Sequence, residues 1–202
     1  MLIGIAGKNN SGKDYVAMRL KTLIEEQIDE DVSVVKFAGK LKEALSVLTG
    51  YEVELFENRE FKETFSPSSF CRKFVDGKFS YCDRAHEDCE CFTIRDLLIY
   101  IGTDLFRNQI HEDIWVELLL KDYTEEKNWI VSDVRFLNEV RRIKSLGGCV
   151  LYLDNDNSQG KNIGDELKDV ADFVFYNEKR NDESLFVNLK KFLYICNKNK
   201  PL

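Results

Sequence analysis

The stretch Gly7-Lys8-Asn9-Asn10-Ser11-Gly12-Lys13-Asp14 follows an apolar run, Leu2–Ala6, and opens a segment in which apolar residues recur at helical spacing. A G-x-x-x-x-G-K sequence between a strand and a helix is the pattern of a phosphate-binding loop. A glycine turn that happens to carry a lysine is the plainer alternative. The strand before the loop and the helix after it favour the phosphate-binding interpretation.

The residue types of this loop suit nucleotide phosphates. Gly7 and Gly12 permit backbone angles that turn successive N–H groups toward phosphate oxygens, and the following helix adds the positive end of its dipole. Lys13 supplies a positive charge for the β- and γ-phosphates of ATP. All eight loop residues are therefore predicted to contact ATP phosphates. Asp14 stands where the pattern usually has Ser or Thr, and its carboxylate is predicted to serve Mg²⁺.

The composition is that of an ordinary globular chain. A length of 202 residues fits a single domain, 1–202, and 44% hydrophobic residues suffice for a substantial core. The sequence contains no run of 18 apolar residues, so we expect no membrane span. The first residues belong to a strand rather than to a signal peptide, so we expect a cytoplasmic protein. The net charge of −7 disfavours a nucleic-acid partner, whereas a small anionic substrate needs only a local basic cluster.

Strand and helix patterns alternate along the chain, which predicts an α/β fold with a central parallel five-stranded sheet and helices on both faces. The expected strands are Leu2–Ala6, Val32–Phe37, Trp129–Ser132, Cys149–Leu153 and Phe173–Tyr176. The expected helices are 13–27, 39–48, 93–110, 112–121, 136–146 and 181–196.

A second constellation lies at the end of the apolar run that begins at Trp129. Asp133 follows this run in the manner of a Walker-B acid, and it is predicted to reach the Mg²⁺ shell beside the phosphate-binding loop. Arg135, Asn138 and Glu139 follow at the expected mouth of the site. A plainer interpretation makes Arg135 and Glu139 an ion pair on a helix surface, four residues apart.

A third cluster contains Arg95 and Arg107, which flank the sequence Gly102-Thr103-Asp104. A guanidinium group binds phosphate in a bidentate manner, so both arginines are candidates for a substrate phosphate. Arginine on a helix is also common as a solvated surface residue.

The segment 51–92 interrupts the alternation and carries a hairpin signal at Asp76-Gly77. The turn sets a register in which Cys71 lies opposite Cys82. With Cys89 and Cys91 these thiols form a set that suits a tetrahedral Zn²⁺ on a small hairpin-containing insertion. Ordinary reduced cysteines and a disulfide are the alternatives, and Cys149 is expected in the core.

Several segments together resemble the deoxynucleoside monophosphate kinases of bacteriophages and large DNA viruses, within the P-loop kinase superfamily. The most specific strings are Arg95-x-Leu97-Leu98-x-x-x-Gly102-Thr103-Asp104 and Ser132-Asp133-Val134-Arg135-Phe136-x-Asn138-Glu139. Further matches are Gly7–Val16, Phe37-Ala38-x-x-Leu41-Lys42-Glu43-Ala44-Leu45, Trp115 and Gly147-Gly148.

The resemblance implies transfer of the ATP γ-phosphate to a deoxynucleoside or nucleoside monophosphate, with Mg²⁺ held by Asp14 and Asp133. It implies catalytic roles for Lys13, Arg95, Asp133 and Arg135. The implied substrate-binding residues are Lys42, Arg95, Arg107, Arg135, Asn138 and Glu139. The segment 51–92 becomes an acceptor-side insertion, and 154–166 becomes a candidate lid. Either Lys161, its only lysine or arginine, or another part of the site supplies the positive charge that lids of this kind carry.

Two alternative functions stay open at this point: a kinase of another phosphorylated metabolite, similar to phosphomevalonate kinase, and a P-loop regulatory protein. The expected partners are small nucleotides, with no nucleic acid and no membrane, and homodimerisation stays open. A viral kinase of this family would work in the host cytoplasm.

Overall fold

The computed structural model describes residues 1–8, 11–67, 72–75, 78–81, 92–154, 165–176 and 182–198. The chain forms two compact units. The sheet unit comprises Met1–Phe37 and Val116–Leu202, and the second unit comprises Ala38–Trp115. The second unit thus includes the predicted insertion 51–92 together with the helical segments on either side of it.

The elements of the sheet unit are β1 (Leu2–Gly7), α1 (Lys13–Ile28), β2 (Val32–Val35), β5 (Asn128–Val134), α6 (Leu137–Ser145), β6 (Cys149–Asp154), η4 (Asp165–Leu167), β7 (Phe173–Tyr176) and α7 (Asp182–Lys198). Helix α5 (Ile114–Leu120) runs into this unit from the second one. No helix in the described ranges combines the length and the apolar character that a membrane crossing requires.

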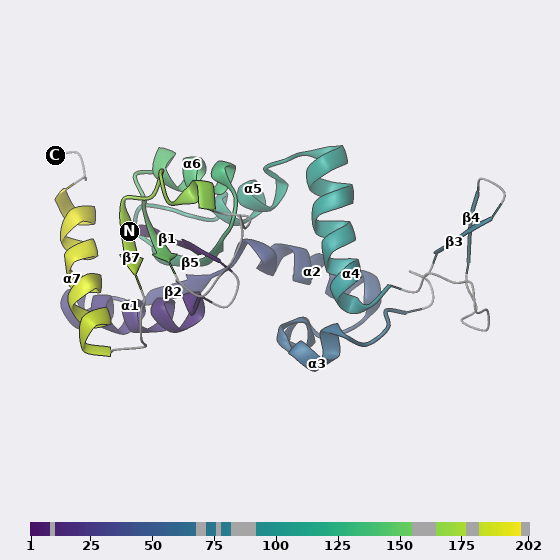
Figure 1. Cartoon of the computed structure of the whole chain (residues 1–202), viewed down its shortest axis with the longest axis horizontal. Coiled ribbons are helices and arrows are strands. Elements are labelled where there is room, and N and C mark those ends of the chain that lie inside the picture. The colour runs from purple at the N-terminus through teal and green to yellow at the C-terminus, as the bar shows by residue number, and fades with distance from the viewer. Residues whose placement is uncertain are drawn as a thin grey trace. The chain divides into compact units, whose positions relative to one another are not determined.

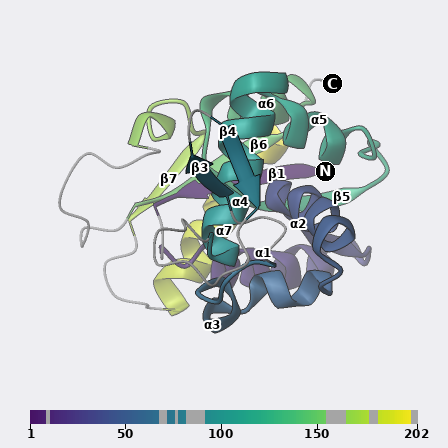
Figure 2. The same cartoon turned by 90° about the vertical axis from the view of Figure 1, so that its right-hand side faces the viewer.

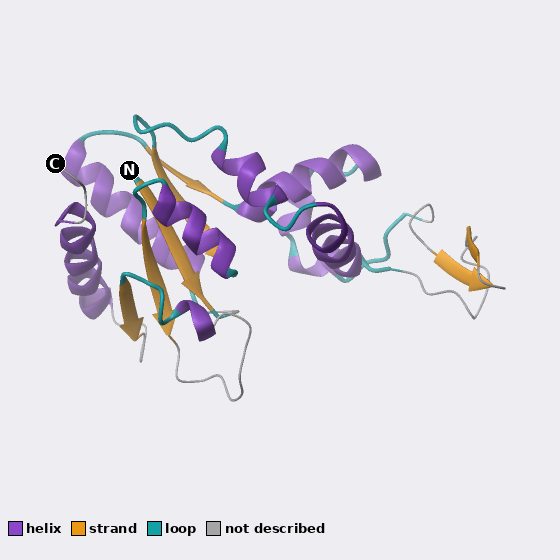
Figure 3. Cartoon of the chain, turned by 90° about the horizontal axis from the view of Figure 1, so that it is seen from above, coloured by secondary structure: helices purple, strands orange, loops and turns teal. Residues whose placement is uncertain are grey.

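Five parallel strands form the main sheet of the described chain, in the order β2-β5-β1-β6-β7 (Figure 3). The central strand β1 is buried along its whole length and pairs with β5 on one side and β6 on the other. Its residues are therefore apolar without alternation, as expected for a strand covered on both faces. The predicted five-stranded parallel sheet is confirmed.

Two hydrophobic clusters cover the two faces of this sheet, so the unit has three layers (Figures 1 and 2). One cluster joins α1 and α7 to the sheet, through residues such as Leu20 and Phe192. It also contains Cys149, which is buried as predicted. The other cluster joins α5 and α6 to the opposite face, through residues such as Val116 and Ile143. Helices on both faces are thus confirmed.

One predicted boundary is wrong in an informative way. The second strand was expected to extend over Val32–Phe37, but β2 ends at Val35 and Phe37 is already the first residue of α2 (Phe37–Thr49). The Phe37 N–H donates to the side chain of Asp133 instead of to a neighbouring strand. A tertiary hydrogen bond therefore ends the strand two residues early, and β-propensity alone does not reveal it.

The other elements of the second unit are η1 (Val53–Glu57), α3 (Arg59–Lys62), β3 (Arg72–Val75), β4 (Lys78–Tyr81), α4 (Ile94–Ile99) and η3 (Tyr100–Ile110). The helix predicted over 93–110 is therefore α-helical only in its first part. From Tyr100 on it is π-helical, and the His111 N–H closes it by donating to the Phe106 carbonyl, five residues back.

Strands β3 and β4 form the predicted hairpin. They are antiparallel, with Arg72 opposite Tyr81 and Val75 opposite Lys78. This is the register that follows from an Asp76-Gly77 turn. The four cysteines of the predicted zinc site, Cys71, Cys82, Cys89 and Cys91, lie outside the described residues.

Candidate functional site

The phosphate-binding loop joins β1 to α1 in the sheet unit, at the carboxyl end of the central strand. Gly7 has φ 147° and Gly12 has φ 88°, both in the region that favours glycine. Gly7 is also required for space, because a Cβ there would lie 2.6 Å from the Leu153 carbonyl oxygen. Asn9 and Asn10, two of the predicted phosphate contacts, lie outside the described residues.

Lys13, the first residue of α1, folds back over the loop. Its ammonium group donates to the carbonyl oxygens of Gly7 at 2.8 Å and Lys8 at 2.6 Å. Burial and then the charge of Arg135 lower the pKa of Lys13 to about 8, although Asp14 and Asp133 act in the opposite direction. Burial and the neighbouring positive charge both destabilise the charged form of Lys13, so a bound anion such as phosphate would stabilise it.

Ser11 contributes a hydroxyl group to the same loop. Its side chain is only 2% exposed, and its Oγ has no hydrogen-bond partner among the described residues. A buried hydroxyl without a partner is unusual in proteins, and a bound phosphate would supply an acceptor for it.

Asp14 is held from two sides. One of its oxygens, Oδ1, accepts from the Ser132 hydroxyl at 3.0 Å and lies 3.2 Å from the Lys36 ammonium group. Partial burial raises the pKa of Asp14, but the hydrogen bond and charge of Lys36, helped by Ser132 and Lys13, outweigh it. The pKa of Asp14 therefore lies below its ordinary value, and the side chain is a carboxylate at neutral pH.

Asp133 lies near the end of β5, the strand beside β1. Its Oδ1 accepts the backbone N–H of Phe37 at 2.8 Å. The structure thus brings Lys13, Asp14 and Asp133 into one electrostatic neighbourhood, as the two sequence motifs predict. Asp14, Ser132 and Asp133 offer carboxylate and hydroxyl oxygens, the ligands that suit Mg²⁺, so the residues present fit this metal.

Arg135 and Glu139 are not the surface ion pair that the plainer interpretation expects. Glu139 is 3% exposed, and its carboxylate accepts the backbone N–H groups of Arg135 at 2.6 Å and Phe136 at 3.1 Å. It therefore caps the amino end of α6 and shapes the turn that carries Arg135. Arg135 itself is exposed, and Asn138 is half-buried on the first turn of α6.

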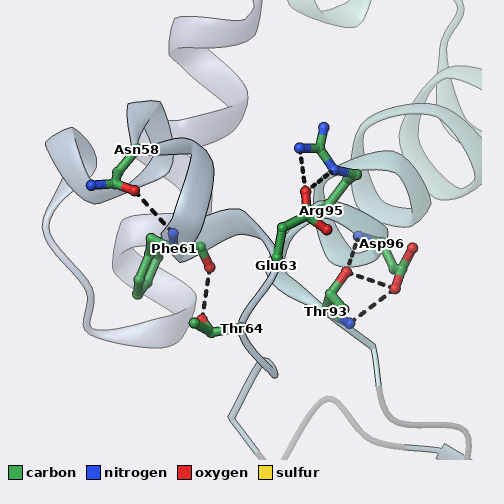
Figure 4. A network of polar contacts seen from close by, with 7 residues as sticks. All are labelled: Asn58, Phe61, Glu63, Thr64, Thr93, Arg95 and Asp96. Carbon is green, nitrogen blue, oxygen red and sulfur yellow. Dashed lines mark hydrogen bonds and ion pairs between the residues drawn. The ribbon is translucent and has the colours of Figure 1, made fainter.

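In the second unit, Arg95 is placed by a local sequence signal. Thr93 accepts the Asp96 N–H at 3.1 Å, and Asp96 in turn accepts the Thr93 N–H at 3.0 Å (Figure 4). This capping box starts α4, so Arg95 lies in the first helical turn. The Arg95 guanidinium forms an exposed ion pair with Glu63, at 2.8 Å from Nε (Figure 4).

Lys42 and Arg107, the other predicted acceptor residues, differ in their surroundings. The Lys42 side chain is 8% exposed and forms an ion pair with Glu57. A buried ammonium group needs such a partner, so contact with a substrate phosphate would have to replace or share it. Arg107 is half-buried in η3. The substrate roles of both residues stay predictions.

Two residues that contact the predicted metal ligands were not proposed from the sequence as members of the site. Ser132 was read as part of a motif, and Lys36 was not singled out. Each contacts Asp14, and neither contact has a local signal. The Ser132 contact depends on the pairing of β1 with β5, and the Lys36 contact depends also on the pairing of β2 with β5. The zinc ligands and most of the lid, including Lys161, lie outside the described residues. No group of three or more potential metal ligands occurs within the described ranges.

The fold and the loop together define a class of protein. A three-layer α/β unit with a phosphate-binding loop after its central strand, and an acid at the end of the neighbouring strand, is the architecture of P-loop nucleotide-binding proteins, kinases among them. A solved structure of a mutant APS kinase from Mycobacterium tuberculosis is similar to this chain with a TM-score of 0.40 and 13% identity, over 94% of this chain and 96% of that one.

The sequence comparisons are more specific. Residues 71–168 match the family model described as deoxynucleotide monophosphate kinase. The chain is also 28% identical over 207 aligned positions to a protein of Acanthamoeba polyphaga mimivirus named "Putative deoxynucleotide monophosphate kinase", covering 91% of each chain. Both findings confirm the resemblance predicted from the motifs: the chain is similar to the deoxynucleotide monophosphate kinases.

Proposed function

We propose that this protein transfers the γ-phosphate of ATP to a deoxynucleoside 5′-monophosphate and releases ADP and a deoxynucleoside diphosphate. The observation that carries the proposal is the grouping of Lys13, Asp14 and Asp133 around the phosphate-binding loop. The match of residues 71–168 to the kinase family supports the choice of acceptor.

In the proposed reaction, an oxygen of the acceptor phosphate attacks the γ-phosphorus of ATP, and the bond to the β–γ bridging oxygen breaks. Lys13 exchanges its loop carbonyls for phosphate oxygens and stabilises the charge that develops on the leaving ADP. Little covalent chemistry is required of the protein, so its contribution is positioning and neutralisation of charge.

Arg135 and Arg95 are the proposed contacts for the transferring and acceptor phosphates. Both side chains are exposed, and each lies at the start of a helix whose amino end is fixed by a capping interaction. Their planar guanidinium groups offer two parallel donors to a phosphate. Asp14 and Asp133 would hold Mg²⁺ when it binds with the nucleotide, and the metal would neutralise part of the negative charge of the phosphates.

The test is a panel of acceptors with ATP and Mg²⁺. The four deoxynucleoside monophosphates, the four ribonucleoside monophosphates and phosphomevalonate are each supplied as acceptor, and ADP release is coupled to NADH oxidation. The identity of each product is checked by ³¹P NMR. We expect at least one deoxynucleoside monophosphate to yield its diphosphate.

Other outcomes would overturn the proposal in distinct ways. Turnover of phosphomevalonate without turnover of any nucleotide would assign the protein to another class of small-molecule kinase. Slow ADP release that no acceptor accelerates would instead favour a P-loop regulatory protein.

A further inference from the structure

Two consecutive residues immediately after β2, Lys36 and Phe37, each contact one of the proposed metal carboxylates. The Lys36 ammonium group lies 3.2 Å from Asp14 Oδ1, and the Phe37 N–H donates to Asp133 Oδ1 at 2.8 Å. Both contacts lie within the sheet unit. The backbone contact holds Asp133 without adding a charge beside it, whereas the Lys36 contact places a positive charge beside the Asp14 carboxylate.

The charge of Asp14 matters because of the position that it occupies. A Ser or Thr at this place in a phosphate-binding loop is neutral, whereas Asp14 adds a second carboxylate near Asp133 and the Ser132 hydroxyl. Carboxylate and hydroxyl oxygens are the kind of ligand that divalent cations prefer in proteins. Lys36 opposes this binding, because its positive charge lies 3.2 Å from the Asp14 carboxylate and would repel a metal ion there. The Lys36 side chain is 30% exposed, so solvent screens this charge only in part.

The cations and carboxylates around the loop nearly balance. Lys13, Lys36 and Arg135 are cationic, and Asp14, Asp133 and the buried Glu139, whose carboxylate accepts the Arg135 N–H, are anionic. A divalent cation that arrives alone therefore finds little net attraction. The phosphates of ATP carry several negative charges and make the site strongly attractive to a cation when they enter the loop.

We propose that Lys36 makes divalent-cation binding at this site depend on bound nucleotide. Lys36 is a positioning residue in this scheme: it acts through Asp14 and need not touch the substrate. The inference rests on the proposed function, since it assumes that the site works with a metal–ATP complex. It assumes nothing about the phosphate acceptor.

The experiment titrates Mn²⁺, as a spectroscopic probe of the Mg²⁺ site, into nucleotide-free protein and measures free Mn²⁺ by electron paramagnetic resonance. Lys36→Met and Lys36→Gln should each bind Mn²⁺ about 3- to 30-fold more tightly than the wild type, the range expected for removal of one unit charge a few ångströms away. Lys36→Arg keeps the charge and should behave as the wild type. Lys190→Met removes the same charge from an exposed site on α7 and is the matched control.

The inference is wrong if neither Lys36→Met nor Lys36→Gln binds Mn²⁺ more tightly than the wild type, or if Lys190→Met has the same effect as they do. A purely structural role for Lys36 would weaken Mn²⁺ binding or leave it unchanged. A second titration in the presence of ATP should tighten Mn²⁺ binding in the wild type by a larger factor than in Lys36→Met. A wild type that does not bind ATP would refute the proposed function, while the nucleotide-free titration would still decide the role of Lys36.

Discussion

Trp115 donates its indole N–H to the carbonyl oxygen of Gly102 at 2.8 Å, in the interior of the second unit. The Trp115 ring also packs against Phe106, with 5.3 Å between ring centroids. Gly102 in turn lies against Leu41, so closely that a Cβ on Gly102 would be 2.5 Å from Leu41 Cδ2. Three segments that carry the family resemblance thus meet in one packing contact. Part of that resemblance therefore reflects the core of the second unit.

The first prediction concerns this contact. Gly102→Ala should destabilise the protein by about 1–3 kcal/mol, because the new methyl group must displace the end of the Leu41 side chain. Urea unfolding followed by circular dichroism measures the loss. Gly39→Ala is the matched control, since a Cβ there would meet no atom within 4 Å, and it should be neutral or stabilising. Equal effects of the two substitutions would contradict the packing role of Gly102.

The second prediction concerns the proposed catalytic lysine. Lys13→Ala should leave a folded protein with at least ~100-fold lower turnover, because one preorganised charge on the transferring group contributes several kcal/mol. Steady-state kinetics and a thermal melting curve are measured on the same preparation. Unchanged turnover together with an unchanged melting curve would contradict the proposed phosphate-binding role of the loop.

The third prediction is a pH dependence of ATP binding. In the ligand-free protein the pKa of Lys13 is about 8, below its ordinary value of 10.5. Bound phosphates favour the charged lysine and raise this pKa, so ATP binding should take up a proton above about pH 8 and weaken by up to about tenfold per pH unit. Below about pH 7 Lys13 is protonated in both states and contributes no dependence.

Isothermal titration calorimetry in buffers of different ionisation enthalpy measures this proton uptake directly. Lys13→Arg is the control, because arginine keeps its charge throughout this range and should abolish the uptake. Proton uptake that persists in Lys13→Arg would assign the effect to another group.

The fourth prediction addresses the two arginines. Arg95→Lys and Arg135→Lys should each lower kcat/KM for the monophosphate by roughly 10- to 1000-fold, because the planar fork is lost although the charge is kept. The affinity for ATP alone should change much less. Arg19→Lys on α1, where Arg19 pairs with Asp182, is a matched control and should leave kcat/KM unchanged. Normal monophosphate turnover by both test variants would refute the proposed acceptor contacts.

The fifth prediction concerns the four cysteines of the insertion. If Cys71, Cys82, Cys89 and Cys91 bind structural zinc, protein purified without a His-tag should contain about one zinc per chain. Inductively coupled plasma mass spectrometry measures the metal content. Less than about 0.2 zinc per chain would exclude a structural zinc site at these cysteines. Thiol titration under denaturing conditions would then distinguish the two alternatives, reduced cysteines and a disulfide.

Sequence patterns predicted the features that depend on local chemistry. The glycines of the phosphate-binding loop, the apolar strands of the sheet and the Asp76-Gly77 hairpin register are each specified by a few neighbouring residues. The helix boundaries were also close, since α1 and α7 begin at the predicted residue or next to it. The end of β2 was predicted wrongly because Asp133, distant along the chain, accepts the Phe37 N–H.

By itself, the sequence determined the class of fold and the position of the phosphate-binding loop, because spacing along one chain sets backbone angles, periodicity and loop length. Tertiary structure alone decided which side chains control the charges at that loop. Lys36, Ser132 and Asp14 come from three separate segments of the chain, and they meet because β2 and β5 pair in parallel beside β1. Electrostatic interactions depend on distance in space, so the counter-ion of Asp14 became visible only once the strands were paired.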